Sequence, residues 1–193
     1  ALSAATTGSG GNTAVGSNAL ALNTTGIFNV AVGANALDAN TTGQSNTAVG
    51  YLSLTATTTG NDNVALGRDS LQTNTEGDSN TAIGFRALRA NTTADYNTAV
   101  GRFAMGVNTT GQRNVAIAPF ALDANTTGSN HVAIGYTALS NNTTANANTA
   151  VGYQSLFANT TGDNNVALGY GTLDANTTAS NNTAIGYNSL TQN

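Results

Sequence analysis

The sequence predicts an all-β protein, a parallel β-solenoid of eleven coils with 17 residues each. The first observation is a segment of the type Asn12-Thr-Ala-Val-Gly16 that returns at a constant interval of 17 residues up to Asn193, without insertion or deletion. The second is that apolar residues recur at fixed places in each unit. The third is that Gly and Asn-Thr-Thr interrupt every unit, which disfavours helices. Such a short fixed period indicates that each unit is one coil of a stack and cannot fold alone.

We number the positions of a unit from 1 to 17, with Asn12 at position 1 of the first coil. The other coils begin at Asn29, Asn46, Asn63, Asn80, Asn97, Asn114, His131, Asn148, Asn165 and Asn182. Positions 1–4 alternate and contain β-branched residues, which predicts a short strand. Position 4 is always a branched aliphatic residue, from Val15 to Ile185, and position 9 is Leu in all coils except one, which has Met105. We expect these two columns to form the core.

Small residues mark the rest of the unit. Position 3 is Ala in every coil, which predicts a close approach across a narrow interior or against another chain. Position 5 is Gly, which suggests a turn with positive φ or no space for a Cβ atom. Ala118, followed by Pro119, is the exception, and we expect a different geometry at that corner.

The domain organisation follows from the repeat. Residues 1–11 form a partial repeat, and residues 12–193 form one continuous rod. We see no polar capping segment, so we expect either an excerpt of a longer array or end-to-end stacking. Each coil offers about two large aliphatic side chains for ordering 17 residues, and this low ratio favours assembly with partner chains.

Composition excludes several classes of function. Charged residues make up 7% of the chain, there is no lysine, and the five arginines are scattered, so a nucleic-acid interface is not expected. No apolar run is long enough to span a membrane. There is no cysteine, and neither paired carboxylates nor a Ser/His/Asp group recurs. We therefore expect no enzyme activity, no metal site and no cofactor. The abundance of Asn and Thr is typical of extracellular proteins.

The Asn-Thr-Thr column at positions 12–14 matches the acceptor pattern for N-glycosylation. The candidate attachment residues are Asn23, Asn40, Asn91, Asn108, Asn125, Asn142, Asn159 and Asn176. Asn141 and Asn181 also fit the pattern. The competing interpretation is a hydrogen-bonded corner that stacks coil on coil, because both residue types favour turns. A threonine ladder that binds ice is a third interpretation, although its threonines would be expected on a flat strand face.

Aromatic residues gather at position 6 of the later coils. Tyr136, Tyr153, Tyr170 and Tyr187 form a candidate surface for a sugar or a receptor. Stacking between coils for stability is the alternative. Aspartates occur in several columns without the regular pattern that bound calcium needs, and His131 has no partner for a metal.

The motif Asn-(Thr/Val)-Ala-(Val/Ile)-Gly-x-x-(Ala/Ser) resembles the head repeat of trimeric autotransporter adhesins, and related repeats of phage tail fibres. The resemblance implies a left-handed β-roll that packs as a homotrimer and attaches to a host surface. From it we expect an extracellular, cell-surface or virion fibre for multivalent attachment, with the variable corner positions as its working surface. A glycan-coated filament and an ice-binding rod are the alternatives.

Overall fold

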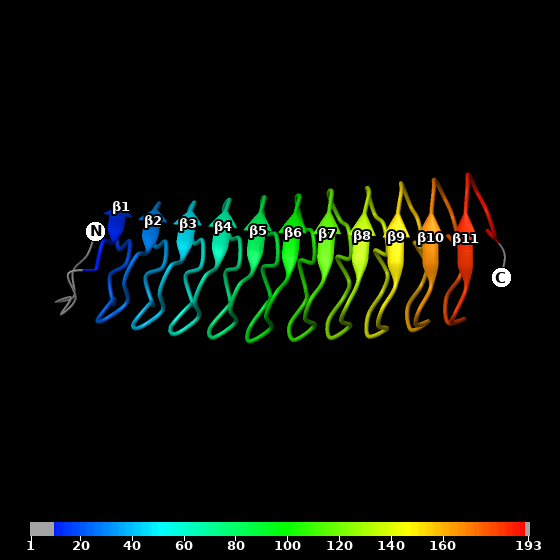
Figure 1. Ribbon diagram of the computed structural model, residues 1–193. Coiled ribbons are helices and arrows are strands. Elements are labelled where there is room, and N and C mark those ends of the chain that lie inside the picture. Colours follow the sequence, from blue (N-terminus) through cyan, green and yellow to red (C-terminus); the bar gives the residue numbers. More distant parts are fainter. Residues whose placement is uncertain (1–9, 192–193) are drawn as a thin grey trace.

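The computed structural model of the protein describes residues 10–191, which form one straight rod of stacked coils (Figure 1). The first nine residues of the expected partial repeat lie outside the described part. Residues 10–191 contain eleven strands and no helix, so the predicted all-β solenoid is confirmed. The strands are β1 (Thr13–Val15), β2 (Val30–Val32), β3 (Thr47–Val49), β4 (Val64–Leu66), β5 (Thr81–Ile83), β6 (Thr98–Val100), β7 (Val115–Ile117), β8 (Val132–Ile134), β9 (Thr149–Val151), β10 (Val166–Leu168) and β11 (Thr183–Ile185).

The strands form one parallel sheet in the order β1 to β11, in strict register. Each residue pairs with the residue at the same position of the next coil, as Ala31 pairs with Ala48. Backbone hydrogen bonds connect each coil to both the preceding and the following coil. In the second coil, Val30 N–H donates to Asn46 O of the following coil and Gly33 N–H donates to Val15 O of the preceding coil, both at 2.8 Å. The repeat therefore fixes the register.

The apolar core is one leucine column between two columns of small residues. Position 9 is fully buried from Leu20 to Leu173, with Met105 in one coil, as the sequence predicts. Position 3 alanines, such as Ala31 and Ala48, are also fully buried. Position 8 contributes alanine, serine or threonine to the same interior. The alanine column therefore lines a narrow interior of a single chain.

The prediction that position 4 belongs to the core is wrong. Side chains of a strand alternate between its two faces, so alanine at position 3 turns inward and positions 2 and 4 turn outward. Val15 is 56% exposed and Leu66 is 47% exposed, whereas Ala65 beside it is fully buried. The interior is too narrow for branched side chains from both walls, because the leucine of position 9 already fills it.

The chain closes each coil through three left-handed residues, at positions 7, 9 and 17. Every core leucine belongs to this set, with φ of 52° at Leu20 and 51° at Leu37. Left-handed conformation is costly for residues with a Cβ atom. Bonds to both neighbours compensate: Asn35 N–H donates to Ser17 O of the preceding coil, and Leu37 N–H donates to Ser53 O of the following coil.

The corner at Ala118 keeps the geometry of the glycine corners, contrary to our expectation. The φ of Ala118 is 119°, close to the 126° to 139° of the glycines at position 5. Its N–H donates to Val100 O at 2.8 Å, the bond that glycine makes in the other coils. Stacking on both neighbours therefore imposes the same conformation on an alanine.

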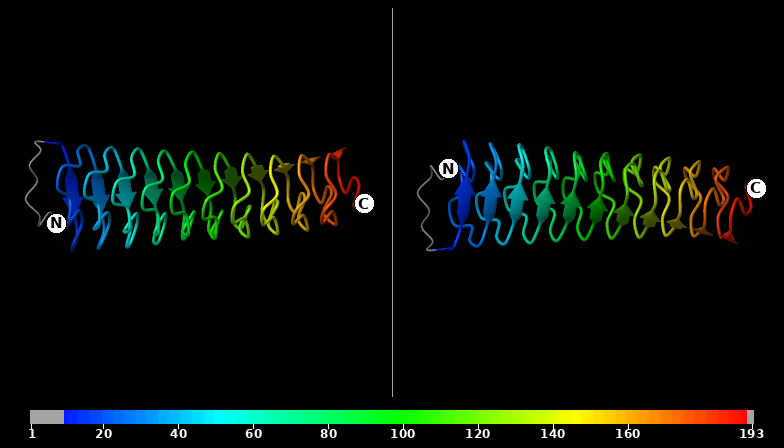
Figure 2. Two further views of the ribbon diagram at one scale, coloured as in Figure 1. Left: turned by 90° about the horizontal axis from the view of Figure 1, so that it is seen from below. Right: turned by 90° about the horizontal axis from the view of Figure 1, so that it is seen from above.

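The sheet twists along the rod. In both views of Figure 2 the strand arrows face the viewer near β1 and turn progressively toward edge-on near β11. The outer surface of the sheet thus winds slowly around the rod axis, as expected from the twist of strands.

Replacement of Thr137 by Asn tests the cost of the left-handed positions. Thr137 is a β-branched residue with φ of 52°, at the position 7 that Asn18 and Asn35 occupy in other coils. Asn tolerates this conformation better, so we expect Thr137→Asn to raise the free energy of unfolding by about 1 kcal/mol in urea titrations. Thr127→Asn, at an exposed corner position without positive φ, is the control and should change little. Equal effects of the two variants would contradict the assignment of strain.

Candidate functional site

The outer side of the sheet is a uniform surface along the rod, which we call the strand face. It consists of the side chains at positions 2 and 4 of β1 to β11. All of them are Thr, Val, Leu or Ile, so the face carries no charge along its full length. Its more exposed aliphatic side chains are Val15, Val64, Leu66, Ile117, Val166, Leu168 and Ile185. Contiguous apolar surface of this extent is typical of interaction sites.

The Asn-Thr-Thr column forms an internal ladder of amides. All eight candidate attachment asparagines are fully buried: Asn23, Asn40, Asn91, Asn108, Asn125, Asn142, Asn159 and Asn176. Within its coil, Asn40 Nδ2 donates to Gly43 O at 3.1 Å. The same nitrogen donates to Asn23 Oδ1 of the preceding coil at 2.7 Å. The amide therefore holds the corner and links two coils.

A second ladder of amides at position 1 meets the same corner. Asn29 Nδ2 donates to Gly43 O at 2.8 Å, across the interior of its own coil. Asn29 Oδ1 accepts from Asn46 N–H of the next coil at 2.9 Å. Both ladders thus converge on the carbonyl of position 15, and sequence reasoning missed this interior role of position 1.

Burial of the column argues against glycans on the folded rod, because the Nδ2 atoms that would carry them already donate inside the protein. Asn141 and Asn181 differ, since both are exposed. The threonines of position 13 also serve the corner: Thr41 Oγ1 donates to Thr58 O of the next coil at 3.0 Å. The geometry therefore favours the interpretation of Asn-Thr-Thr as a stacking corner.

Thr57 interrupts the ladder at position 12. Its hydroxyl donates to Asn74 O at 3.0 Å and leaves Asn40 Oδ1 buried without a hydrogen-bond partner. Asn74 Nδ2 correspondingly donates only to Gly77 O. The substitution thus removes two bonds that the neighbouring coils make.

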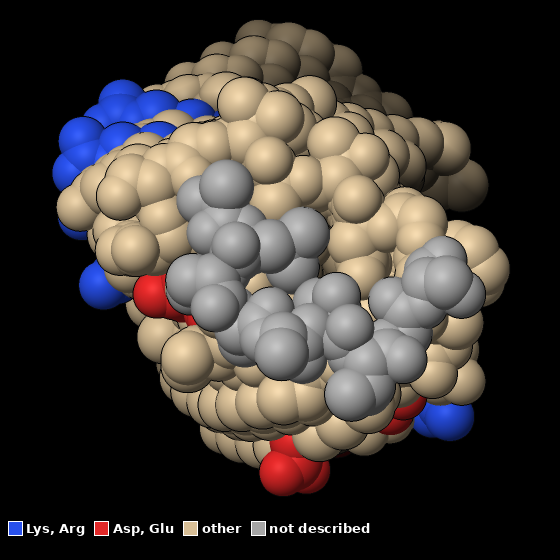
Figure 3. Space-filling model, turned by 90° about the vertical axis from the view of Figure 1, so that its left-hand side faces the viewer, with Lys and Arg blue, Asp and Glu red and all other residues tan. Residues whose placement is uncertain are grey.

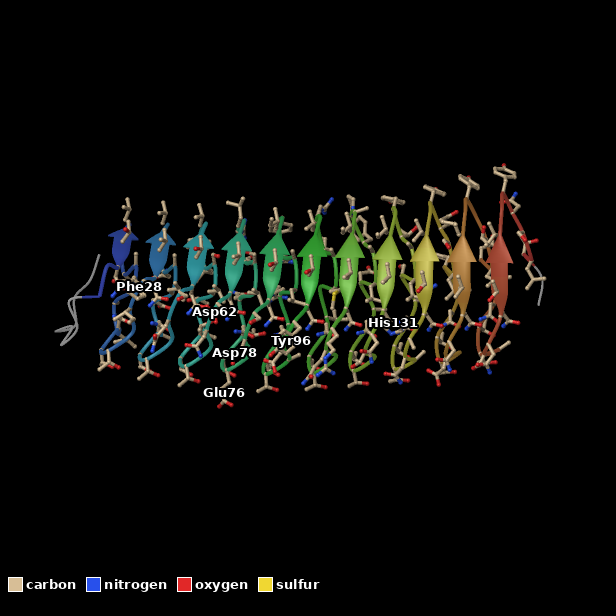
Figure 4. The ribbon with its side chains drawn as sticks, in the orientation of Figure 1. Phe28, Asp62, Glu76, Asp78, Tyr96 and His131 are labelled. Atoms are coloured by element: carbon tan, nitrogen blue, oxygen red, sulfur yellow. The ribbon has the colours of Figure 1, made fainter. Side chains whose placement is uncertain are left out.

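His131 takes the place of asparagine in the position 1 ladder and is fully buried. It lies near the start of β8 (Val132–Ile134; Figure 4). Its Nδ1 accepts from Asn148 N–H at 3.1 Å, as an asparagine Oδ1 would. Nε2 therefore carries the proton and lies 2.6 Å from Ala145 O, to which it donates. Burial lowers the pKa of His131, because the charged imidazolium loses its hydration.

The tyrosines at position 6 of the last four coils form a stack at one corner, beside the carboxyl ends of the strands. Ring centroids are 5.7 Å apart for Tyr136 and Tyr153, 4.9 Å for Tyr153 and Tyr170, and 5.1 Å for Tyr170 and Tyr187. These rings are parallel to within 10° to 16°. Each inner ring therefore has both faces covered by its neighbours. A sugar could reach the edges and hydroxyls of these inner rings but could not stack on their faces.

The stack continues through phenylalanines and ends among arginines. Phe85, Phe103 and Phe120 extend the row of rings toward the middle of the rod, through edge-to-face contacts between Phe120 and Tyr136 and between Phe85 and Phe103. The guanidinium of Arg86 lies 5.0 Å from the ring centroid of Phe85, and that of Arg102 lies 5.1 Å from that of Phe103. Seen along the rod, most of the basic atoms gather on one edge (Figure 3). Cation–π contacts thus hold the arginines in place.

Acidic side chains serve as local acceptors. Asp78 Oδ1 accepts from Asn61 N–H at 2.6 Å, and Asp95 Oδ1 accepts from Asp78 N–H at 2.8 Å. In Figure 4 Asp62, Glu76 and Asp78 lie in the lower half of the coils. Burial raises the pKa of Asp123, while its bond from Ser140 opposes that shift.

Residues 10–191 offer no concave site. No pocket is found in them, and they hold no group of three His, Cys, Asp or Glu side chains that could bind a metal. This part of the chain also has no helix of the length and apolarity that a membrane crossing needs.

Replacement of Thr57 by Asn should repair the interrupted ladder. The new amide would donate to Asn40 Oδ1 and accept from Asn74 Nδ2, so we expect the free energy of unfolding to rise by about 1–2 kcal/mol. The matched variant Asn108→Thr would create the same interruption elsewhere and should destabilise by a similar amount. Urea denaturation followed by circular dichroism measures both. A loss of stability in Thr57→Asn would contradict the ladder.

The stability of the rod should fall in acid because of His131. Its pKa lies near 6.5 in the unfolded chain and lower in the folded rod, so only the unfolded chain binds the proton as the pH drops through this interval. The free energy of unfolding should therefore decrease below about pH 6.5, by at most about 1.4 kcal/mol per pH unit. His131→Asn restores the repeat and should remove this part of the decrease. The urea midpoint of each protein is measured at neutral pH and in acid. An equal decrease of the midpoint in the unaltered protein and in His131→Asn would refute the proposed role of His131.

No protein-family model matches the chain, and neither the curated proteins nor the solved structures include a significant match.

Proposed function

We propose that the chain is a segment of a structural fibre, in which copies of the rod pack together through their strand faces and present their corners for attachment. The observation that carries this proposal is the uncharged, largely aliphatic strand face, which extends from β1 to β11. The arginines and the acidic residues are at corner positions of the coils. A surface that excludes charge over the whole length of a rod is suited to burial.

The shape of the face favours another copy of the same chain as its partner. The face winds around the rod, as Figure 2 shows, so a flat partner could contact only part of it. A second rod has the same period and the same twist, and can follow the face from end to end. This reasoning also disfavours ice binding, since a crystal lattice is flat. A homotrimer is the arrangement that the resemblance to adhesin heads implies.

The corner positions would then supply the adhesive function. Positions 6, 7, 10, 16 and 17 vary between coils, while the interior columns stay nearly constant. Weak contacts repeated along several copies add up through effective concentration. We therefore place the fibre outside the cell, on a cell surface or a virion, where it attaches to host molecules or glycans.

Glycans could attach at Asn141 and Asn181, which are exposed. Excess mass on the peptides that contain these residues would reveal such attachment. The buried Asn-Thr-Thr column does not favour a continuous glycan coat.

Replacement of Val100 by Asp tests the proposed packing. Val100 ends β6 at the middle of the strand face, and a buried carboxylate there is costly in an assembly. We expect the unaltered rod to form an oligomer and the Val100→Asp variant to be monomeric or at least tenfold weaker in association, at about 1.4 kcal/mol for each factor of ten. Analytical ultracentrifugation measures the state of both.

The control is Thr110→Asp, which adds the same charge at an exposed corner position of the same coil. It should leave the oligomer intact, and circular dichroism should show the same β-structure in all three proteins. A monomeric unaltered rod at micromolar concentration, or an oligomer that tolerates Val100→Asp, would refute packing through the strand face.

A further inference from the structure

We infer that the tyrosine stack at position 6 is a site of oxidative cross-linking, at which a one-electron oxidant joins successive coils of the same chain by dityrosine bonds. The residues are Tyr136, Tyr153, Tyr170 and Tyr187. This inference is independent of the strand face and of the assembly proposed above.

The geometry brings the reacting atoms together before any oxidation. The rings of Tyr153 and Tyr170 are 4.9 Å apart and within 10° of parallel, and those of Tyr170 and Tyr187 are 5.1 Å apart and within 16°. These residues occupy equivalent positions of neighbouring coils in register, so their hydroxyls point the same way. Contact between nearly parallel rings brings the carbons ortho to one hydroxyl near the ring of the next tyrosine.

The tyrosines are also accessible to an oxidant. Tyr136, Tyr153 and Tyr170 are 45%, 41% and 47% exposed, and Tyr187 is 76% exposed. Tyr153 and Tyr170 have both ring faces covered by neighbouring rings, so their exposed parts are the ring edges and the hydroxyl groups. The stack is thus poorly shaped for binding a planar ligand but well placed for losing electrons to solution.

The reaction balances with a peroxidase that uses hydrogen peroxide. Each of two tyrosines loses one electron and its phenolic proton and becomes a tyrosyl radical. The two radicals couple through their ortho carbons, and the ring hydrogens at those carbons move to the oxygens as both rings regain aromaticity. Two tyrosines and one hydrogen peroxide thus give one dityrosine and two water molecules.

Coupling within the chain is favoured over coupling between chains. Neighbouring coils hold the two radicals within contact for as long as both exist, which corresponds to an effective concentration far above that of a second molecule. The expected product is therefore a covalent staple between adjacent coils of one rod, which leaves the molecular mass of the chain that of a monomer.

The chain contains its own control tyrosines. Tyr51 and Tyr96 are 49% and 57% exposed, similar to the stacked tyrosines. Their ring neighbours are arginines, since the guanidinium groups of Arg68 and Arg113 each lie 6.0 Å from the respective ring centroid. Exposure alone would oxidise all six tyrosines alike, whereas stacking selects four of them.

The experiment treats the full chain with horseradish peroxidase and hydrogen peroxide, then measures dityrosine fluorescence and maps linked peptides by mass spectrometry. We expect links between Tyr153 and Tyr170 and between Tyr170 and Tyr187, and none that involve Tyr51 or Tyr96. Tyr170→Phe keeps the stacked ring but removes the two closest of the three stacked pairs and leaves only Tyr136 with Tyr153, so the initial rate of dityrosine formation should fall to about a third. Tyr51→Phe should leave the yield unchanged.

Two results would overturn the inference. One is dityrosine that forms mainly between molecules, recognised when equal amounts of isotopically light and heavy chains give mixed linked peptides. The other is a yield in the folded chain no greater than in the same chain unfolded in urea, where the stack is absent. Unchanged circular dichroism of Tyr170→Phe confirms that its lower yield does not come from unfolding.

Discussion

The asparagine amide inside each coil is the interaction on which the rest of the structure depends. At position 1 it closes its own coil through the carbonyl of position 15 and accepts the backbone N–H of the next coil, as Asn29 does. One side chain thus satisfies two backbone groups that the narrow interior withholds from water. A buried backbone group without a partner costs about as much as a lost hydrogen bond, so neither asparagine column can become aliphatic without leaving several groups unpaired.

This polar interior leaves little space for apolar side chains. Each coil buries one leucine among alanines, and its branched aliphatic residue at position 4 lies outside. The arrangement reverses the usual distribution, in which the largest aliphatic residues are the most buried. A single rod therefore gains less stability from apolar burial than its composition suggests. Contact of the strand face with a partner would bury the remaining aliphatic side chains and add to this stability. The narrow cross-section thus has two consequences. Buried asparagines must satisfy the backbone groups inside, and the branched aliphatic side chains must lie outside.

The period of the sequence was sufficient to predict the stack, the strands and their register, because one constant interval admits only one alignment of equivalent residues. It was not sufficient to decide which face of the strand turns inward. Alternation places Ala31 and Val32 on opposite sides, but the choice between them depends on the width of the interior, which neither residue reveals. The left-handed leucines gave no local signal either, since only the glycines at position 5 suggested positive φ. The asparagines could have been recognised as internal, because a column that accepts only Asn, Thr or His is more restricted than a solvated corner requires.

The columns that tolerate substitution show how such a rod can acquire function without refolding. His131 fits the interior only because its two nitrogens reproduce the acceptor and the donor of an amide. At the outer corners no such match is required, and position 6 carries Tyr51, Arg68, Phe85 and Pro119 in different coils. Because equivalent corner residues of adjacent coils are in contact, a run of similar substitutions becomes a continuous surface feature. The stack from Phe85 to Tyr187 is such a feature, and its chemistry depends on the stacking of its members as well as on their exposure.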